Sequence, residues 1–270
     1  MAKLVACQMV SSPDVHTNLD TVRRLVAQQQ PGDLVVLPEC FACFGASDKY
    51  LLSVAEKKGE GQIQTCLSQL AKQYGVWIVA GTVPLRCEDQ QKYTASCLIY
   101  NDQGDCVEEY QKIHLFDVQV QDTTRNYKES KYTQAGSRLV VVDSPFGKLG
   151  IAVCYDVRFA GLFQAMGQID VLALPAAFTQ TTGEAHWHAL LRARAIEKQC
   201  YLVAAGQGGK HENGRETYGH SCVISPWGTI SEEIQKGEGA ISAHFDKSEI
   251  TRIRASMPVH EHNQFRSYLV

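Results

Sequence analysis

Residues 33–41 read Asp-Leu-Val-Val-Leu-Pro-Glu-Cys-Phe, and the architecture of the chain can be worked out from this stretch. Leu34 to Leu37 form an uninterrupted apolar run, which is typical of a strand buried on both faces. Pro38 ends the strand because it cannot donate to a sheet ladder, and it keeps Leu37 extended. We therefore expect a buried strand whose end displays Glu39.

Strand and helix patterns alternate on both sides of this stretch. Residues 4–9 predict an earlier strand, and the apolar residues within 19–26 fall on one face at helical spacing. A second helical pattern at 67–74 precedes a near-continuous apolar strand at 76–83. This alternation predicts an α/β layer architecture.

The rest of the chain continues the pattern without a break. We find no Pro/Gly/Ser-rich linker or low-complexity segment, so we expect a single domain over residues 1–270. Residues 172–178 share a pattern with residues 35–41: each has a buried strand stopped by proline, followed by small residues and Phe. Such a repeat would suit two sheets related by an approximate two-fold axis. The further expected elements are hairpins at 93–110 and 219–233, strands at 138–142, 149–154, 171–174 and 201–207, and a helix at 186–198.

Composition excludes several classes of protein. The 270 residues are 44% hydrophobic, enough for a large core. Lys and Arg number 26 against 29 Asp and Glu, a net charge of −3 without long runs of one sign, which argues against nucleic acid or a membrane as partner. A strand pattern begins at Leu4 with no leader before it, and ten scattered cysteines suit a reducing compartment, so we expect a cytoplasmic protein.

Three segments place a reactive side chain just beyond an apolar strand, where ligand sites of open α/β sheets lie. They carry Glu39, Lys112 and Cys154. A base, a cation and a thiol are the groups needed for nucleophilic attack on an amide or nitrile carbon. The thiol needs a base because its ordinary pKa is about 8.5, and we expect Glu39 to take its proton. We expect Lys112 and the backbone N–H of Tyr155 to stabilise the oxyanion.

These motifs resemble those of the carbon-nitrogen hydrolase (nitrilase) superfamily. Its Glu-Lys-Cys triad is matched by Glu39 in Pro-Glu-Cys-Phe, by Lys112 in Tyr-Gln-Lys-Ile-His-Leu-Phe-Asp, and by Cys154 in Cys-Tyr-Asp-Val-Arg-Phe. The resemblance extends over nearly the whole chain, and it implies a four-layer α-β-β-α sandwich and a homodimer. It also implies that Glu129, in Lys-Glu-Ser, supports Lys112, and that turnover proceeds through an acyl-thioester with no metal or cofactor.

Within the superfamily the chain most resembles the Nit branch. That resemblance implies a small-molecule amide substrate with an α-ketoglutaryl-like acyl group, and it favours deaminated glutathione. The alternative is an ω-amidase that acts on α-ketoglutaramate or another small linear amide or N-carbamoyl compound. Arg158 would suit the carboxylate of the acyl group, because a guanidinium binds it bidentately. The chain departs from the branch at Gly161 and His188, where acidic residues are usual. Both departures remove an acid near the expected site.

Other interpretations of single motifs remain open. Cys40 and Cys43 form a C-x-x-C, which could be a redox dithiol or half of a zinc site. The histidine pairs at 186–188 and 260–262 could bind a metal, but residues two apart on a helix point to different faces, so surface or capping roles are favoured. A non-catalytic binding or scaffold protein on the same fold is the other class of function. Release of ammonia from α-ketoglutaramate, or of cysteinylglycine from deaminated glutathione, would separate it from an amidase.

Overall fold

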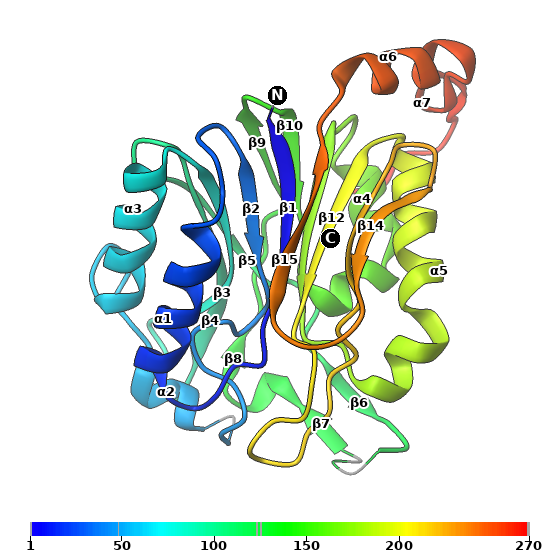
Figure 1. The fold of residues 1–270 in the computed structure, drawn as a ribbon. Coiled ribbons are helices and arrows are strands. Elements are labelled where there is room, and N and C mark those ends of the chain that lie inside the picture. The colour runs from blue at the N-terminus through cyan, green and yellow to red at the C-terminus, as the bar shows by residue number, and fades with distance from the viewer. Residues whose placement is uncertain (1, 48, 123, 125, 269–270) are drawn as a thin grey trace.

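Two packed β-sheets form the centre of the molecule (Figure 1). The computed structural model describes residues 2–47, 49–122, 124 and 126–268. One sheet has the order β15-β1-β2-β3-β4-β5, with β8 paired to β4, and the other has the order β14-β13-β12-β11-β10-β9. Strands β6 and β7 form a separate ribbon. The strands are β1 (Lys3–Gln8), β2 (Leu34–Leu37), β3 (Trp77–Arg86), β4 (Tyr93–Tyr100), β5 (Cys106–Gln111), β6 (Asp117–Gln119), β7 (Asn126–Lys128), β8 (Thr133–Gln134), β9 (Val140–Ser144), β10 (Gly147–Ile151), β11 (Val171–Ala176), β12 (Tyr201–Gly206), β13 (Ser221–Ile224), β14 (Ile230–Ile234) and β15 (Gly239–His244).

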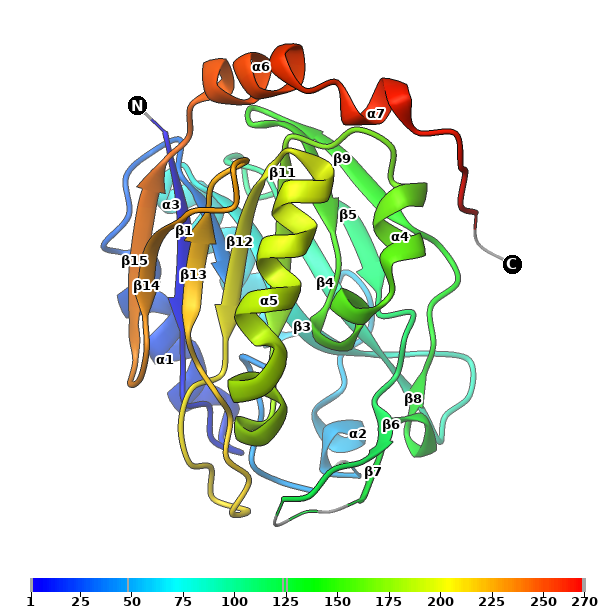
Figure 2. The same cartoon turned by 90° about the vertical axis from the view of Figure 1, so that its right-hand side faces the viewer.

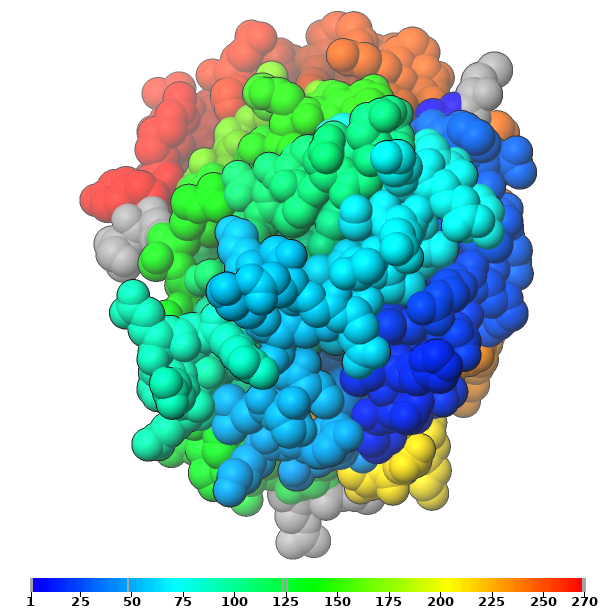
Figure 3. All heavy atoms as spheres, turned by 90° about the vertical axis from the view of Figure 1, so that its left-hand side faces the viewer, coloured from blue at the N-terminus to red at the C-terminus, as the bar shows by residue number. Residues whose placement is uncertain are grey.

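Helices cover the outer face of each sheet, which completes a four-layer α-β-β-α sandwich (Figures 1 and 2). Helices α1 and α3 cover the first sheet, and α4 and α5 cover the second. Figure 3 shows the α1 and α3 face, with the C-terminal helix α6 along its upper edge. The helices are α1 (Val15–Val26), α2 (Tyr50–Val54), α3 (Gln62–Tyr74), α4 (Ala160–Ala165), α5 (Gln180–Lys198), α6 (Lys247–Ser256) and α7 (Val259–His262), and two 3₁₀ turns are η1 (Glu129–Lys131) and η2 (Cys154–Arg158).

The alternation of side chains along β1 explains why there are two cores. Leu4 and Ala6 pack between the sheets, whereas Val5 and Cys7 pack against the outer helices. Each burial of a large aliphatic side chain contributes about 1.5–3 kcal/mol. Since β1 is apolar on both faces, it can exist only as an inner strand covered on both sides, as the sequence predicts.

The predicted strands and helices are confirmed, with two corrections near the site. The strand expected at 149–154 ends at Ile151, because Cys154 has a left-handed backbone (φ 50°) and opens η2. The strand expected to stop at proline continues through Pro175 to Ala176, and Ala176 pairs with Gly206 of β12. No sequence pattern predicted the elements α2, α4, α6, α7, β6, β7, β8 and β15.

The course of the chain brings the ends of β2 and β11 together. These strands lie in different sheets, yet the backbone N–H of Ala177, just after β11, donates to Oε2 of Glu39, just after β2, at 2.8 Å. The two segments that share a sequence pattern therefore meet at one place, at the lower end of the sandwich in Figure 1. In the part of the chain that the structure describes, no helix is both long and apolar enough to span a membrane.

Candidate active site

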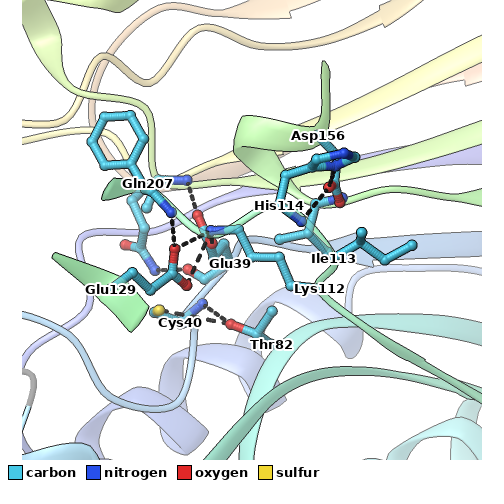
Figure 4. A network of polar contacts seen from close by, with 12 residues as sticks. Glu39, Cys40, Thr82, Lys112, Ile113, His114, Glu129, Asp156 and Gln207 are labelled. Carbon is cyan, nitrogen blue, oxygen red and sulfur yellow. Dashed lines mark hydrogen bonds and ion pairs between the residues drawn. The ribbon is translucent and has the colours of Figure 1, made fainter. Parts of the chain in front are cut away.

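Glu39, Lys112 and Glu129 meet in one buried cluster beyond the strand ends (Figure 4). The Nζ of Lys112 donates to Oε1 of Glu39 at 2.7 Å and to Oε2 of Glu129 at 2.9 Å. Lys112 is only 2% exposed and Glu39 5%. The chain thus gathers residues 73 and 17 positions apart around one ammonium group, as the sequence analysis expected.

The two carboxylates keep this buried lysine charged. Burial alone would lower the pKa of Lys112, but the carboxylates of Glu129 and Glu39 raise it well above its ordinary value. Burial raises the pKa of Glu129, and the positive charge of Lys112 opposes that effect. A buried charge held in this way is a fixed cation that water does not screen. Such a group can stabilise a developing oxyanion.

The thiol of Cys154 faces the same cluster from the second sheet. Burial raises its pKa well above the ordinary range, the Glu39 carboxylate raises it further, and Lys112 lowers it. The resting sulfur is therefore a protonated thiol beside a carboxylate. A nucleophile in this state needs a base at the moment of attack, and Glu39 is the carboxylate in position to serve.

Asp156 fixes Cys154 relative to Lys112. It is fully buried, and its Oδ2 accepts from the Val153 N–H at 2.8 Å and from the Tyr110 hydroxyl at 2.7 Å. Its Oδ1 accepts from the backbone N–H of His114 at 3.1 Å and lies 2.7 Å from Nδ1 of the same residue (Figure 4). One carboxylate thus ties the turn that carries the thiol to the strand end that carries the lysine. Asp156 was not predicted from the sequence as a site residue, although it lies within the cysteine motif.

The backbone around Glu39 is held just as firmly. Gln207, at the end of β12, donates from Nε2 to the Glu39 carbonyl at 3.1 Å. Cys40 has a left-handed backbone (φ 55°), and its N–H donates to Oγ1 of Thr82 at 2.9 Å. Non-glycine residues rarely adopt this conformation, and they keep it only where the surroundings enforce it. The two strained residues Cys40 and Cys154 line the same cavity.

A cavity opens onto the cluster and defines where a substrate can lie. Two of its lining residues are the cations Lys128 and Arg215, and the Arg215 guanidinium lies over the rings of Phe44 and Tyr127 at 4.8 and 5.0 Å. Neither cation was predicted from the sequence. The residues that line the cavity include Glu39, Cys40, Cys43, Phe44, Lys112, Phe116, Tyr127, Lys128, Glu129, Cys154, Tyr155, Ala177, Phe178, Thr179, Thr182 and Arg215.

Comparisons with known proteins agree with this geometry. The profile of the carbon-nitrogen hydrolase family, described as "Carbon-nitrogen hydrolase", matches residues 3–255. The chain belongs to the carbon-nitrogen hydrolase family. It is 39% identical to a deaminated glutathione amidase of Yersinia enterocolitica, with 100% of this chain and 95% of the relative covered. It is 35% identical to omega-amidase NIT2-B of Xenopus laevis, with 99% and 97% covered. The solved structure of Nit3 from Saccharomyces cerevisiae superposes with a TM-score of 0.87 at 30% identity, with 98% and 97% covered.

The protein is therefore an amidase that hydrolyses carbon-nitrogen bonds outside peptides, and the Cys154 thiol at its cavity is the candidate nucleophile. The predicted family, fold and enzyme class are confirmed. The amidase interpretation is favoured over the non-catalytic scaffold.

Arg158 lies beside the cavity of this hydrolase and is not among its lining residues. Its guanidinium lies 5.2 Å from the centre of the Phe178 ring and 5.9 Å from that of Tyr155, both of which line the cavity. Its Nη1 is also 3.3 Å from Nδ1 of His186. Arg158 thus packs behind two residues of the cavity wall and is not itself part of that wall.

The two departures from the family pattern lie away from the triad. Gly161 is on the exposed side of α4, and the Cβ of any replacement would face Ser267 at 3.7 Å. His188 is on α5, and its Nε2 lies 2.7 Å from Oε1 of Glu233. Neither position lines the cavity. The absence of an acidic side chain at these two positions therefore leaves the cluster of Glu39, Lys112 and Glu129 unchanged.

The C-x-x-C cysteines also lie at the cavity of the amidase. Cys40 and Cys43 both line it, and both are free thiols. Burial raises the pKa of each, to about 11 for Cys43. Of the other histidines, His186 and His188 diverge from α5 to different partners, as residues two apart on a helix must.

Proposed function

We propose that this protein hydrolyses the amide bond of deaminated glutathione through an acyl-thioester on Cys154. The observation that supports this most is the position of Glu39, whose carboxylate both contacts the fixed ammonium of Lys112 and adjoins the Cys154 thiol. The substrate follows from the relatives, since the deaminated glutathione amidase of Yersinia enterocolitica matches over the full chain.

The first half of the reaction forms the thioester. Glu39 accepts the proton of the Cys154 thiol while the sulfur attacks the amide carbon. The carbonyl oxygen gains the negative charge, and Lys112 together with the Tyr155 N–H stabilises it. Tyr155 lies in the first turn of η2, where N–H groups lack an acceptor within the helix. Glu39 then returns its proton to the leaving nitrogen, the C–N bond breaks, and the amine departs.

The second half releases the acid. Glu39, again ionised, takes a proton from water as the water oxygen attacks the thioester carbon. The C–S bond then breaks, the acid leaves, and Cys154 recovers its proton from Glu39. Glu129 touches no reacting atom in this scheme, and it acts by holding Lys112 in place.

The cavity carries cations for the carboxylates of this substrate. Deaminated glutathione has one carboxylate on its acyl portion and another at the end of its leaving group, whereas α-ketoglutaramate has only the first. Besides Lys112, the cations Arg215 and Lys128 line the cavity. We assign the acyl carboxylate to Arg215, and Arg158 stays the alternative from the sequence.

A pair of matched variants decides between the two arginines. Arg215→Met is expected to raise KM for deaminated glutathione about tenfold or more, since a charged hydrogen bond is worth about 1.5–3 kcal/mol, while Arg158→Met leaves KM within about twofold. The reverse pattern would return the role to Arg158.

The second candidate activity is that of an ω-amidase, because omega-amidase NIT2-B of Xenopus laevis also matches over nearly its full length. One preparation assayed with deaminated glutathione and with α-ketoglutaramate separates the two. We expect the higher kcat/KM with deaminated glutathione, and a preference for α-ketoglutaramate would overturn the substrate assignment. Loss of both activities in Cys154→Ala, with an unchanged circular dichroism spectrum, tests the thiol mechanism separately from the substrate.

We also propose that the enzyme works as a homodimer in the cytoplasm. Support for the dimer comes from an apolar surface formed by Ile196 of α5, 48% exposed, and Trp227 of the β13–β14 turn, 60% exposed. Gly228, the residue after Trp227, lies against the Ile196 side chain, since a Cβ on Gly228 would fall 2.6 Å from it. Light scattering is expected to give twice the chain mass for the native protein and the monomer mass for Ile196→Asp. A native monomer would refute the proposal.

A further inference from the structure

Two histidines and a glutamate outside the active site converge on one point. His188 lies on α5, His220 immediately precedes β13, and Glu233 lies on β14. Nε2 of His188 and Nδ1 of His220 each lie 2.7 Å from Oε1 of Glu233. One nitrogen from each ring and a carboxylate oxygen all fall within 4.8 Å of one another.

The surrounding structure holds these side chains in their orientation. His220 has a left-handed backbone (φ 51°), its N–H donates to the Gln235 carbonyl, and its own carbonyl accepts from Nε1 of Trp187 at 2.9 Å. The Tyr218 ring stacks on the His220 ring at 4.1 Å. Preorganised rings of this kind, fixed by a second layer of contacts, are typical of metal ligands in proteins.

We propose that His188, His220 and Glu233 bind a divalent transition metal, with Zn²⁺ as the best fit. Two imidazole nitrogens and one carboxylate oxygen form a common three-residue zinc set, to which water adds the fourth ligand. At Zn–N distances of about 2.0–2.1 Å, tetrahedral ligand atoms lie about 3.4 Å apart. The present 2.7 Å separations therefore need to widen by only about 0.7 Å, which small rotations of the side chains provide.

The site is reachable from solvent, and its one carboxylate offsets part of the charge of a divalent ion. The three side chains are 31%, 16% and 22% exposed, in the order His188, His220 and Glu233, so an ion can enter from solvent. Each imidazole moves its proton to the ring nitrogen that faces away from the ion, and no redox step is involved.

A metal at this position joins α5 to the β13–β14 hairpin. The Trp187 ring packs on the Phe178 ring at 4.8 Å, and Phe178 lines the catalytic cavity. The Tyr218 N–H also donates to the Phe178 carbonyl at 2.9 Å. The bound ion would therefore stabilise one wall of the active site without taking part in the thiol chemistry.

Titration of the full-length, tag-free protein with Zn²⁺ and Co²⁺ tests this site. The Cys154→Ala background removes the catalytic thiol as a competing ligand. We expect one equivalent of Zn²⁺ by calorimetry, a higher Tm on binding, and visible Co²⁺ bands of a nitrogen and oxygen site without thiolate charge-transfer absorption. No binding, or a cobalt spectrum with thiolate absorption, overturns the proposal.

Three variants and a matched control locate the ligands. His188→Gln, His220→Gln and Glu233→Gln are each expected to weaken binding at least tenfold and to remove the rise in Tm. Glu233→Gln keeps a carbonyl that accepts from both rings, so it separates metal binding from folding. His186 lies on the same helix and points away from the cluster, so His186→Gln should bind Zn²⁺ with an affinity within twofold of that of the parent. Parent-like binding by the three variants, or an equal loss in His186→Gln, overturns the assignment.

Discussion

Asp156→Asn is the substitution that most severely tests how the site is held together. The carboxylate accepts at Oδ2 from the Val153 N–H and the Tyr110 hydroxyl, and at Oδ1 from the His114 backbone N–H and ring nitrogen. An asparagine has only one carbonyl oxygen. Its NH₂ group must therefore face either the Val153 N–H or the His114 N–H, and that buried donor loses its acceptor.

The cost of this change can be worked out from these contacts. One orphaned buried donor costs about 1–3 kcal/mol, and each of the remaining bonds loses roughly 1 kcal/mol when its acceptor is no longer charged. We expect Asp156→Asn to lower the free energy of unfolding by about 4 kcal/mol. Because a misplacement of about 1 Å can cost about 100-fold in rate, kcat should fall about 100-fold in the protein that stays folded.

Urea unfolding and steady-state kinetics measure the two effects. Asp143→Asn is the matched control, since the Asp143 carboxylate is 88% exposed and pairs with Lys148 on the surface. We expect the control to change stability by less than about 0.5 kcal/mol and to leave kcat unaffected. If Asp156→Asn costs less than about 1 kcal/mol and keeps its turnover, Asp156 does not hold Cys154 against Lys112.

Three further predictions follow from the same cluster. Lys112→Met should lower the free energy of unfolding by about 3–5 kcal/mol, because it leaves two carboxylates without their cation, and it should lower kcat at least about 100-fold. Lys148→Met is the exposed control. A folded, active Lys112→Met protein would contradict the role of Lys112. Glu39→Gln should lower the pKa of Cys154, since burial and the Glu39 carboxylate together raise it. A pH titration of thiolate absorbance, with Cys154→Ala subtracted as the blank, should show the Cys154 thiolate forming at a lower pH than in the parent. Hydrolysis should be lost in the same variant. Dialysis against EDTA should lower Tm through the His188 cluster yet leave turnover at the assay temperature unchanged, and loss of turnover that zinc restores would place a metal in the reaction.

The sequence predicted the central part of the site because each of its members follows its own strand. Glu39 comes directly after an apolar run that ends in proline, and Cys154 follows an apolar run that has no proline. The strand pattern was therefore enough to place both residues at a sheet edge. The predicted end of the strand at Cys154 was wrong by three residues. The apolar pattern runs on to Cys154, and it does not reveal that this residue has a left-handed backbone.

The remaining residues could not be predicted in the same way. Arg215 lies in the loop between β12 and β13, and only the folded chain places it over Phe44 and Tyr127. His188 and Glu233 are 45 positions apart, and no spacing rule brings them together. Asp156 was the exception, because an acidic residue two positions beyond the candidate nucleophile could have been recognised as a turn-fixing group.

The covalent intermediate gives the most direct test of the whole account. Enzyme mixed with deaminated glutathione, quenched in acid within the first turnovers and digested, should yield the peptide that contains Cys154 with the mass of one α-ketoglutaryl group added. The adduct should be absent from Cys154→Ala and should disappear from the parent as substrate runs out. Full turnover with no adduct on Cys154 under any quench time, or an active Cys154→Ala protein, would contradict the account.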